Sequence, residues 1–361
     1  MYLKNYKVCV YAITKNEEKF VKRWVDSMQE ADKIIVLDTG STDNTVNALR
    51  ELGVEVYEKQ FNPWRFDVAR NEVLNLVPIE YDICVCTDLD EVFEKGWYDE
   101  LLKVWDDSVT RVKYTYNWSF NEQQKPATTF LLNKIHKRDA YIWTHPVHEV
   151  LTPLIKEKEV INKNITLNHY PDYTKSRSNY LPLLELSVKE DPDDDRNMHY
   201  LGREYMYYQK YDLAIKTLQK HLSLEKATWK DERCASMRFI ARCYTAQNDL
   251  EKAKEYYEMA INEAPYLREP YIELAYQYYE REDYLQSYDL LKKALEIKEK
   301  SESYINEEFA WNSFVYDLMG IVCFNLKYYN DAYYYTKEAL SLEPDNLRLQ
   351  INLGEIEKFV K

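Results

Sequence analysis

The sequence predicts two domains of different fold class, an α/β domain with a mostly parallel sheet followed by an all-α domain of helical repeats. Short apolar runs alternate with helical patterns in the first part of the chain, which is typical of parallel βαβ units. Near the middle the strand-like runs stop, and one helical pattern recurs to the end. We place the α/β domain at 1–172, a helical connector at 173–195 and the repeat domain at 196–361.

Strands and helices are expected to alternate strictly in the α/β domain. Three apolar runs predict buried strands, at 8–13, 34–37 and 83–86, and a short strand is predicted at 54–57. Apolar residues at helical spacing predict helices between them, over 16–29, 42–52 and 67–77. Gly53 is expected to stop the second helix, Asp67 to cap the third and Pro78 to close it.

Polar residues follow the predicted strands at one end. The fourth strand leads into Asp88 and Asp90, which we expect to project the same way from an extended chain. A divalent cation held between them and a diphosphate would suit such a pair of carboxylates. Asp38 follows the second strand and Thr14 ends the first. Because the carboxyl ends of parallel strands meet at one edge, these residues predict a ligand site there.

Four segments in order resemble the successive motifs of glycosyltransferase family 2. They are residues 11–18, 36–45, 66–71 and 88–91. The resemblance implies the GT-A fold, a Rossmann-like architecture, and transfer of a sugar from a UDP-sugar donor.

The resemblance also assigns donor-binding roles. Asp38 would receive the N3–H of uracil, with Thr14 near the same ring. Arg70 would approach the diphosphate, where a planar guanidinium pairs with phosphate oxygens. Asp90 would coordinate Mn²⁺ or Mg²⁺ directly, and Asp88 would contact the ribose or the waters of the metal. A helix N-cap role for Asp38 and a surface ion pair for Arg70 stay open as alternatives.

Three of the six histidines accompany a carboxylate in the middle of the chain. His145, His148 and Glu149 resemble the H-x-x-x-H-E or V-H-E segment of the family 2 branch that includes the sublancin S-glycosyltransferase. The two histidines of this chain are separated by one residue fewer than those of the H-G-K-V-H-E form. The resemblance implies that Glu149 or His148 deprotonates the acceptor and that His169 helps to hold the cation or diphosphate. A zinc hydrolase site on the three histidines is the alternative, although the two aspartates favour Mn²⁺ or Mg²⁺.

Aromatic residues are dense in the same region. Trp118 and Trp143 are candidates for contact with the sugar or the acceptor, and His145 is a third. The alternation of Tyr114, Tyr116 and Trp118 is strand-like and favours packing in the sheet core instead.

From residue 197 onward the chain resembles tetratricopeptide repeats. Four units combine small residues at helix crossings with aromatic residues between helices, and they lie near Tyr200, Phe239, Tyr271 and Tyr316. Longer stretches at 225–232 and 297–309 interrupt the spacing. Such a solenoid is expected to present a concave surface to an extended peptide or to a second copy of the chain in a homodimer.

Bulk properties exclude several classes of function. A net charge of −14 argues against binding to nucleic acid or anionic lipid. No run approaches the roughly twenty apolar residues of a membrane span, and no signal peptide is apparent. The six cysteines are scattered, so the expected compartment is the reducing cytoplasm.

The combined prediction is a metal-dependent, inverting glycosyltransferase that moves a hexose from a UDP-sugar to a peptide or protein side chain. A saccharide or lipopolysaccharide-core precursor is the alternative acceptor. Outside enzymes, the alternative is a repeat-type adaptor that carries a degenerate transferase domain.

Overall fold

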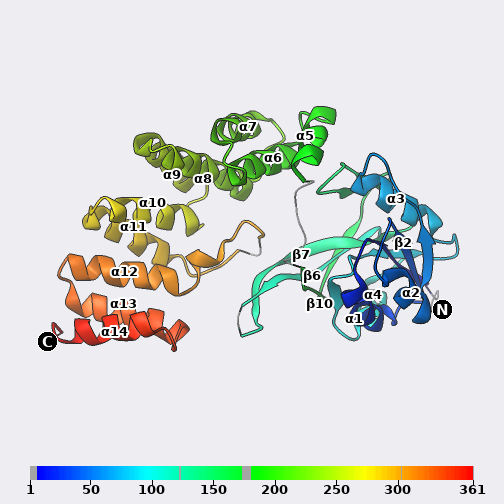
Figure 1. Ribbon diagram of the computed structural model, residues 1–361, viewed down its shortest axis with the longest axis horizontal. Helices are drawn as coiled ribbons and strands as arrows, with labels where there is room; N and C mark the ends of the chain where they lie inside the picture. The colour runs from blue at the N-terminus through cyan, green and yellow to red at the C-terminus, as the bar shows by residue number, and fades with distance from the viewer. Residues whose placement is uncertain (1–5, 122, 173–179, 302, 361) are drawn as a thin grey trace. The chain divides into compact units, whose positions relative to one another are not determined.

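The computed structural model describes residues 6–121, 123–172, 180–301 and 303–360 (Figure 1). Two compact units divide the chain, Met1–Glu190 and Asp191–Lys361. Among the described residues, no helix is both long and apolar enough to cross a membrane.

An eight-stranded sheet forms the centre of the N-terminal unit, with the order β3-β2-β1-β4-β7-β6-β10-β5. Its first four strands are parallel. The elements up to the fourth strand are β1 (Val8–Thr14), α1 (Glu18–Met28), β2 (Lys33–Asp38), α2 (Thr45–Glu51), β3 (Glu55–Glu58), α3 (Phe66–Leu76) and β4 (Ile83–Cys86). The predicted alternation of strands and helices is therefore confirmed.

The rest of the unit extends the sheet with both antiparallel and parallel pairs. The remaining elements are β5 (Glu91–Phe93), α4 (Trp97–Val104), β6 (Arg111–Phe120), β7 (Pro126–Lys137), β8 (Tyr141–Thr144), β9 (Val150–Pro153), β10 (Glu159–His169) and α5 (Tyr180–Glu190). β7 pairs antiparallel with both β4 and β6, whereas β8 and β9 form a separate two-stranded sheet. The connector helix predicted from residue 173 has its first residues outside the described part of the chain.

Helices cover both faces of the parallel strands because alternate side chains of each strand point in opposite directions. In β1, Val10 packs in a core that includes Trp24 of α1 and Leu101 of α4. Tyr11 belongs to the opposite core with Val73 of α3. Each fully buried apolar side chain of this size contributes about 1.5–3 kcal/mol.

The prediction that Asp67 caps α3 is wrong, because the N-cap residue is Arg65. The helix begins at Phe66, so Asp67 lies in its first turn, where a carboxylate interacts favourably with the helix dipole. Arg65 donates to both oxygens of Asp67, at 3.0 and 2.8 Å. Gly53 has a φ of +81° after the end of α2, as a residue that stops a helix should.

Helical hairpins form the C-terminal unit, and the predicted all-α repeat class is confirmed. The described pairs are α6 (Asp195–Tyr207) with α7 (Tyr211–Ser223), α8 (Lys230–Ala246) with α9 (Leu250–Glu263), α10 (Glu269–Glu280) with α11 (Tyr284–Glu296), and α12 (Ser313–Asn325) with α13 (Tyr329–Leu342). A short 3₁₀ helix at Glu308–Ala310 precedes α12, and α14 (Leu347–Glu357) packs on α13.

Glycines permit the close crossing of paired helices. A Cβ atom at Gly202 of α6 would lie 2.5 Å from Cγ of Leu218 in α7. A Cβ atom at Gly320 of α12 would lie 2.5 Å from Oγ1 of Thr336 in α13. A Cβ atom does not approach another non-bonded heavy atom this closely, so a larger residue at either glycine would force the neighbouring side chain to shift.

Candidate active site

The first two strands of the sheet place Thr14 beside Asp38. The two residues are partners in the parallel register of β1 and β2. The carboxylate of Asp38 accepts the N–H groups of Gly40 and Ser41, each at 2.9 Å, so it shapes the loop that follows β2. The N-cap of α2 is Asn44, which excludes the alternative of Asp38 as a helix cap. The hydroxyl oxygen of Thr14 is buried and has no hydrogen-bond partner among the described residues.

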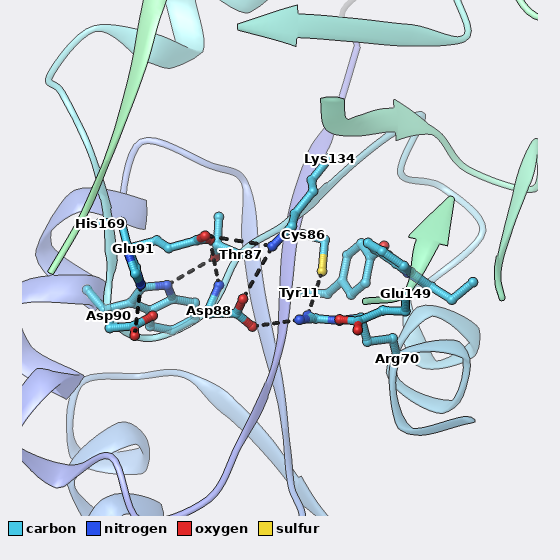
Figure 2. Close-up of polar contacts among 12 residues, drawn as sticks. Tyr11, Arg70, Cys86, Thr87, Asp88, Asp90, Glu91, Lys134, Glu149 and His169 are labelled. Atoms are coloured by element: carbon cyan, nitrogen blue, oxygen red, sulfur yellow. Dashed lines mark hydrogen bonds and ion pairs between the residues drawn. The ribbon is translucent and has the colours of Figure 1, made fainter. Parts of the chain in front are cut away.

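The residues after β4 form a turn, and the prediction of a common direction for Asp88 and Asp90 is wrong. The strand ends at Cys86, and the N–H of Glu91 donates to the carbonyl of Asp88 at 3.0 Å. The N–H of Asp88 donates in return to the Glu91 carboxylate at 2.9 Å. Figure 2 shows the two aspartates facing different partners.

Asp88 lies between two cations. Oδ1 accepts from Nη2 of Arg70 at 2.8 Å, and Oδ2 accepts from Nζ of Lys134 at 3.3 Å. Burial alone would raise the pKa of Asp88, but Arg70 and Lys134 outweigh it and hold the pKa below its ordinary value. Both oxygens are already paired, so Asp88 is poorly suited to ligate a metal directly.

Arg70 is the centre of the polar cluster (Figure 2). Besides Asp88, its Nε donates to Oε1 of Glu149 at 2.5 Å and its Nη1 to Sγ of Cys86 at 3.2 Å. The side chain is only 4 % exposed, so the alternative of a surface ion pair is wrong. Burial disfavours the charged guanidinium, yet the neighbouring anions raise its pKa well above the ordinary value. Arg70 is therefore a fixed positive charge at the carboxyl edge of the sheet.

The indole ring of Trp143 packs against the guanidinium of Arg70. The guanidinium carbon lies 5.2 Å from the centre of the indole ring, a cation–π distance. The indole N–H donates to the hydroxyl of Tyr11 at 2.9 Å, and that hydroxyl lies 2.8 Å from Nε2 of His136. Burial lowers the pKa of His136 to about 4, so its imidazole is neutral at neutral pH. Since Trp143 is 3 % exposed, the structure does not support its predicted contact with a sugar.

Asp90 and His169 form a polar pair next to the Arg70 cluster. Oδ2 of Asp90 lies 3.4 Å from Nε2 of His169, and Nδ1 of the same ring lies 3.0 Å from the carbonyl of Trp118. The indole of Trp118 stacks on the imidazole at 4.4 Å and remains 42 % exposed. Burial opposes protonation of His169, but Asp90 outweighs it and raises the pKa.

Lys134 and Glu91 are functional candidates that the sequence analysis missed. Nζ of Lys134 lies 3.7 Å from Oε1 of Glu91, which also accepts from the hydroxyl of Tyr116 at 2.7 Å. Burial raises the pKa of Glu91. The available signal was a single lysine within the apolar run that became β7, but only the pairing of β7 with β4 brings it to Asp88.

The loop between β8 and β9 carries the predicted histidines. His145 and His148 have φ angles of +75° and +50°, a left-handed conformation that costs free energy in residues other than glycine. The carbonyl of Pro146 in this loop accepts the first N–H of α3, from Phe66, at 3.0 Å. The loop thus brings Glu149 to Arg70, while the ring of His148 lies 6.0 Å from that of Tyr180.

The donor atoms fit a metal held by two protein ligands. Among the described residues, no three His, Cys, Asp or Glu side chains gather around one point, and this includes the histidines of the zinc alternative. Asp90 and His169 nevertheless face each other with an oxygen and a nitrogen donor. A cation with several open positions, which phosphate oxygens and water fill, suits such a pair.

Comparison with known proteins identifies the class of the N-terminal unit. Residues 9–157 match the sequence model of Glycosyl transferase family 2, and this segment is a family 2 domain. A stretch of 96 residues is 32% identical to an uncharacterized glycosyltransferase of Rickettsia typhi and covers 26% of this chain and 32% of that protein. An uncharacterized glycosyltransferase of Rickettsia bellii is 33% identical over 96 residues, which are 26% of this chain and 31% of that protein. The chain thus spans about a third of the length of the curated relatives it matches.

Solved structures resemble other parts of the chain more distantly. MamA is 18% identical, with 50% of this chain and 99% of that chain covered and a TM-score of 0.38. A TPR repeat-containing protein from Cytophaga hutchinsonii is 15% identical, with 50% and 66% covered and a TM-score of 0.41.

Proposed function

We propose that the chain transfers a hexose, with inversion at the anomeric carbon, from a UDP-sugar to a side chain of a peptide or protein. The family 2 match supports the reaction class. The observation that supports it most is the connected set of charges at the carboxyl edge of the sheet, in which Arg70 joins Asp88 to Glu149 while Asp90 faces His169. These groups suit an anionic diphosphate and a divalent cation.

Donor binding would use two groups of residues at the carboxyl edge of the sheet, one for the base and one for the metal and diphosphate. Asp38 and Thr14 lie side by side, and a uracil ring at this edge would give the buried hydroxyl of Thr14 the hydrogen-bond partner that it lacks among the described residues. Asp90 and His169 would hold Mn²⁺ or Mg²⁺, which when bound neutralises charge on the departing UDP. Arg70 would receive the diphosphate, and because its Nε already holds Glu149, the donor would compete with that carboxylate.

This competition gives Glu149 a place in the reaction. As long as Arg70 holds the Glu149 carboxylate, the guanidinium occupies one of its oxygens. When phosphate oxygens take over the guanidinium, the Glu149 carboxylate would be released toward the acceptor. Glu149 or the adjacent His148 would then take the proton of the acceptor as its atom attacks C1 of the sugar. The repeat unit would bind the acceptor, or a second copy of the chain.

Glu149→Gln and His148→Ala separate the two possible bases. If Glu149 is the base, Glu149→Gln should lower kcat by about 100-fold or more and bind UDP more tightly, since a neutral amide competes weakly for Arg70. His148→Ala should then keep most of its turnover. If His148 is the base, the order should reverse: His148→Ala should lower kcat by about 100-fold or more, and Glu149→Gln should keep most of its turnover. Nearly full kcat in both variants at saturating donor would exclude this loop as the source of the base.

A further inference from the structure

The connection between the third and fourth hairpins is longer than the others in the C-terminal unit. The connections after α7, α9 and α13 span residues 224–229, 264–268 and 343–346, whereas the one after α11 spans 297–312. It is drawn in orange in Figure 1, and residue 302 within it lies outside the described part. Its residues 303–307, here called the return segment, fold onto the first helices of the preceding hairpins.

Those first helices form the surface that receives the return segment. We call this surface the first-helix face, and it is defined by Tyr200 of α6, by Trp229, Glu232, Arg238 and Arg242 in or next to α8, and by Glu269 and Glu273 of α10. The repeat pattern predicts a concave surface that receives an extended peptide or a second copy of the chain. The structure places a segment of the same chain on the first-helix face instead.

An aromatic contact holds one end of the return segment. The hydroxyl of Tyr304 donates to Oε2 of Glu232 at 2.6 Å. The Tyr304 ring centre lies 5.3 Å from that of Trp229 and 6.2 Å from that of Tyr200. Burial raises the pKa of Tyr304 well above its ordinary value, so the phenol stays protonated and keeps donating to the carboxylate.

An acidic contact holds the other end. The carboxylate of Glu307 accepts from Nη2 of Arg242 at 2.7 Å and also from Arg238. The backbone N–H of Glu307 donates to Oε1 of Glu269 at 3.0 Å. Between the two ends, Ile305 and Asn306 are each 6% exposed. Side chains at two anchor positions and a backbone hydrogen bond are the means by which a peptide ligand is recognised.

The first-helix face keeps other partners for its charges when the return segment leaves. Arg242 also donates to both oxygens of Glu273, at 3.0 and 2.8 Å, and Arg238 pairs with the same carboxylate. Glu232 lies 3.3 Å from Nε2 of His221. After release, Arg238 and Arg242 still share the Glu273 carboxylate and Glu232 still lies beside His221, so each of these side chains keeps a polar neighbour.

We propose that the first-helix face is a binding site for an extended acidic peptide with a tyrosine three residues before a glutamate, and that the return segment is its intramolecular competitor. Tyr304 and Glu307 supply this spacing within the chain. A tethered segment has an effective concentration in the millimolar range, so a free peptide binds the intact protein weakly. The proposal concerns binding alone and does not depend on the transferase reaction.

Fluorescence anisotropy with a labelled peptide of residues 303–308 tests the proposal on the full chain. The double variant Tyr304→Ala and Glu307→Ala should bind the peptide on the order of tenfold or more tightly than the wild type. Glu308→Ala, a substitution at an exposed position beside the return segment, should bind the peptide with the same affinity as the wild type. A peptide with alanine at both anchor positions should bind to none of the proteins. Adding Arg242→Gln to the double variant should reverse the gain.

Equal affinity of the wild type and a folded double variant would overturn the proposal and leave the return segment a structural element only. Circular dichroism establishes whether the double variant is folded. If it is not, the wild type is incubated with excess peptide that carries benzoylphenylalanine in place of the tyrosine, and is then irradiated. Crosslinks within residues 229–242 would support the proposal, whereas their absence from this range would contradict it.

Discussion

At the scale of single residues, Arg70 connects the groups that the proposed reaction needs. One buried guanidinium joins the turn after β4 to the loop between β8 and β9, because its separate N–H groups reach Asp88 and Glu149 at once. Lysine has no such planar arrangement of donors, which is why arginine suits this position. Removing the guanidinium would leave two carboxylates close together in a largely buried site, and Lys134 could compensate for only one of them.

Arg70→Met should therefore lower the free energy of unfolding by about 3–5 kcal/mol, the usual cost of breaking a buried ion pair from one side. Arg50 offers a matched control, since it pairs with Glu58 at 2.7 Å but is 49% exposed. Arg50→Met should cost less than about 1 kcal/mol. Chemical denaturation of both variants measures the difference. Equal losses would show that the Arg70 cluster is not held as a buried unit.

His136 provides a pH-dependent prediction at the same scale. Its pKa is lowered to about 4 by burial, whereas an exposed histidine in the unfolded chain titrates near 6.5. Between these values the unfolded state binds a proton that the folded state does not, so stability falls as the pH decreases. His136→Gln should flatten the loss of stability between about pH 6.5 and 4, an effect of at most about 3 kcal/mol. Thermal unfolding across this range checks it, and an unchanged slope would contradict it.

At the scale of elements, close helix crossings hold the repeat unit together. Gly202 lies where α6 meets α7, and a side chain there would collide with Leu218. Gly354 of α14 has no atom within 4 Å of a Cβ built on it. The two glycines are both helical, so they experience the same intrinsic preference for alanine and differ only in packing.

Gly202→Ala should destabilise the protein by about 1–3 kcal/mol because the crossing must open. Gly354→Ala should be neutral or should stabilise it by up to about 1 kcal/mol through the better helix propensity of alanine. The comparison is made by urea denaturation of the two variants. A loss in the second variant as large as in the first would refute the packing argument.

At the scale of the whole molecule, local structure was more predictable from the sequence than contacts between residues that are distant in the sequence. The alternation up to β4 follows from apolar runs and helical spacing, and it appeared as expected. The role of Lys134 did not, because it depends on β7 returning antiparallel beside β4. The direction of Asp88 was also missed, since the reciprocal bonds with Glu91 bend the chain out of the strand.

The repeat unit shows the same limit. Recurrent small and aromatic residues predicted the helical hairpins, and the unusual length of the stretch at 297–309 was visible in the sequence. The surface against which this stretch packs could not be predicted. Tyr304 binds Glu232 and Glu307 binds Arg238, and these partners are distant in the sequence. Local patterns thus indicated the elements, whereas the site and the covered repeat surface required the tertiary structure.

The most direct test of the proposed donor site is a thermal-shift measurement with UDP, GDP, CDP and UDP-sugars, each with and without Mn²⁺ or Mg²⁺. We expect metal-dependent stabilisation by UDP and by one UDP-sugar, because a ligand that binds only the folded state raises the melting temperature. Asp90→Ala should lose the metal dependence without unfolding, and Asp38→Ala should lose the preference for UDP. No shift of the wild-type protein with any nucleotide would contradict the donor site and favour a degenerate transferase domain.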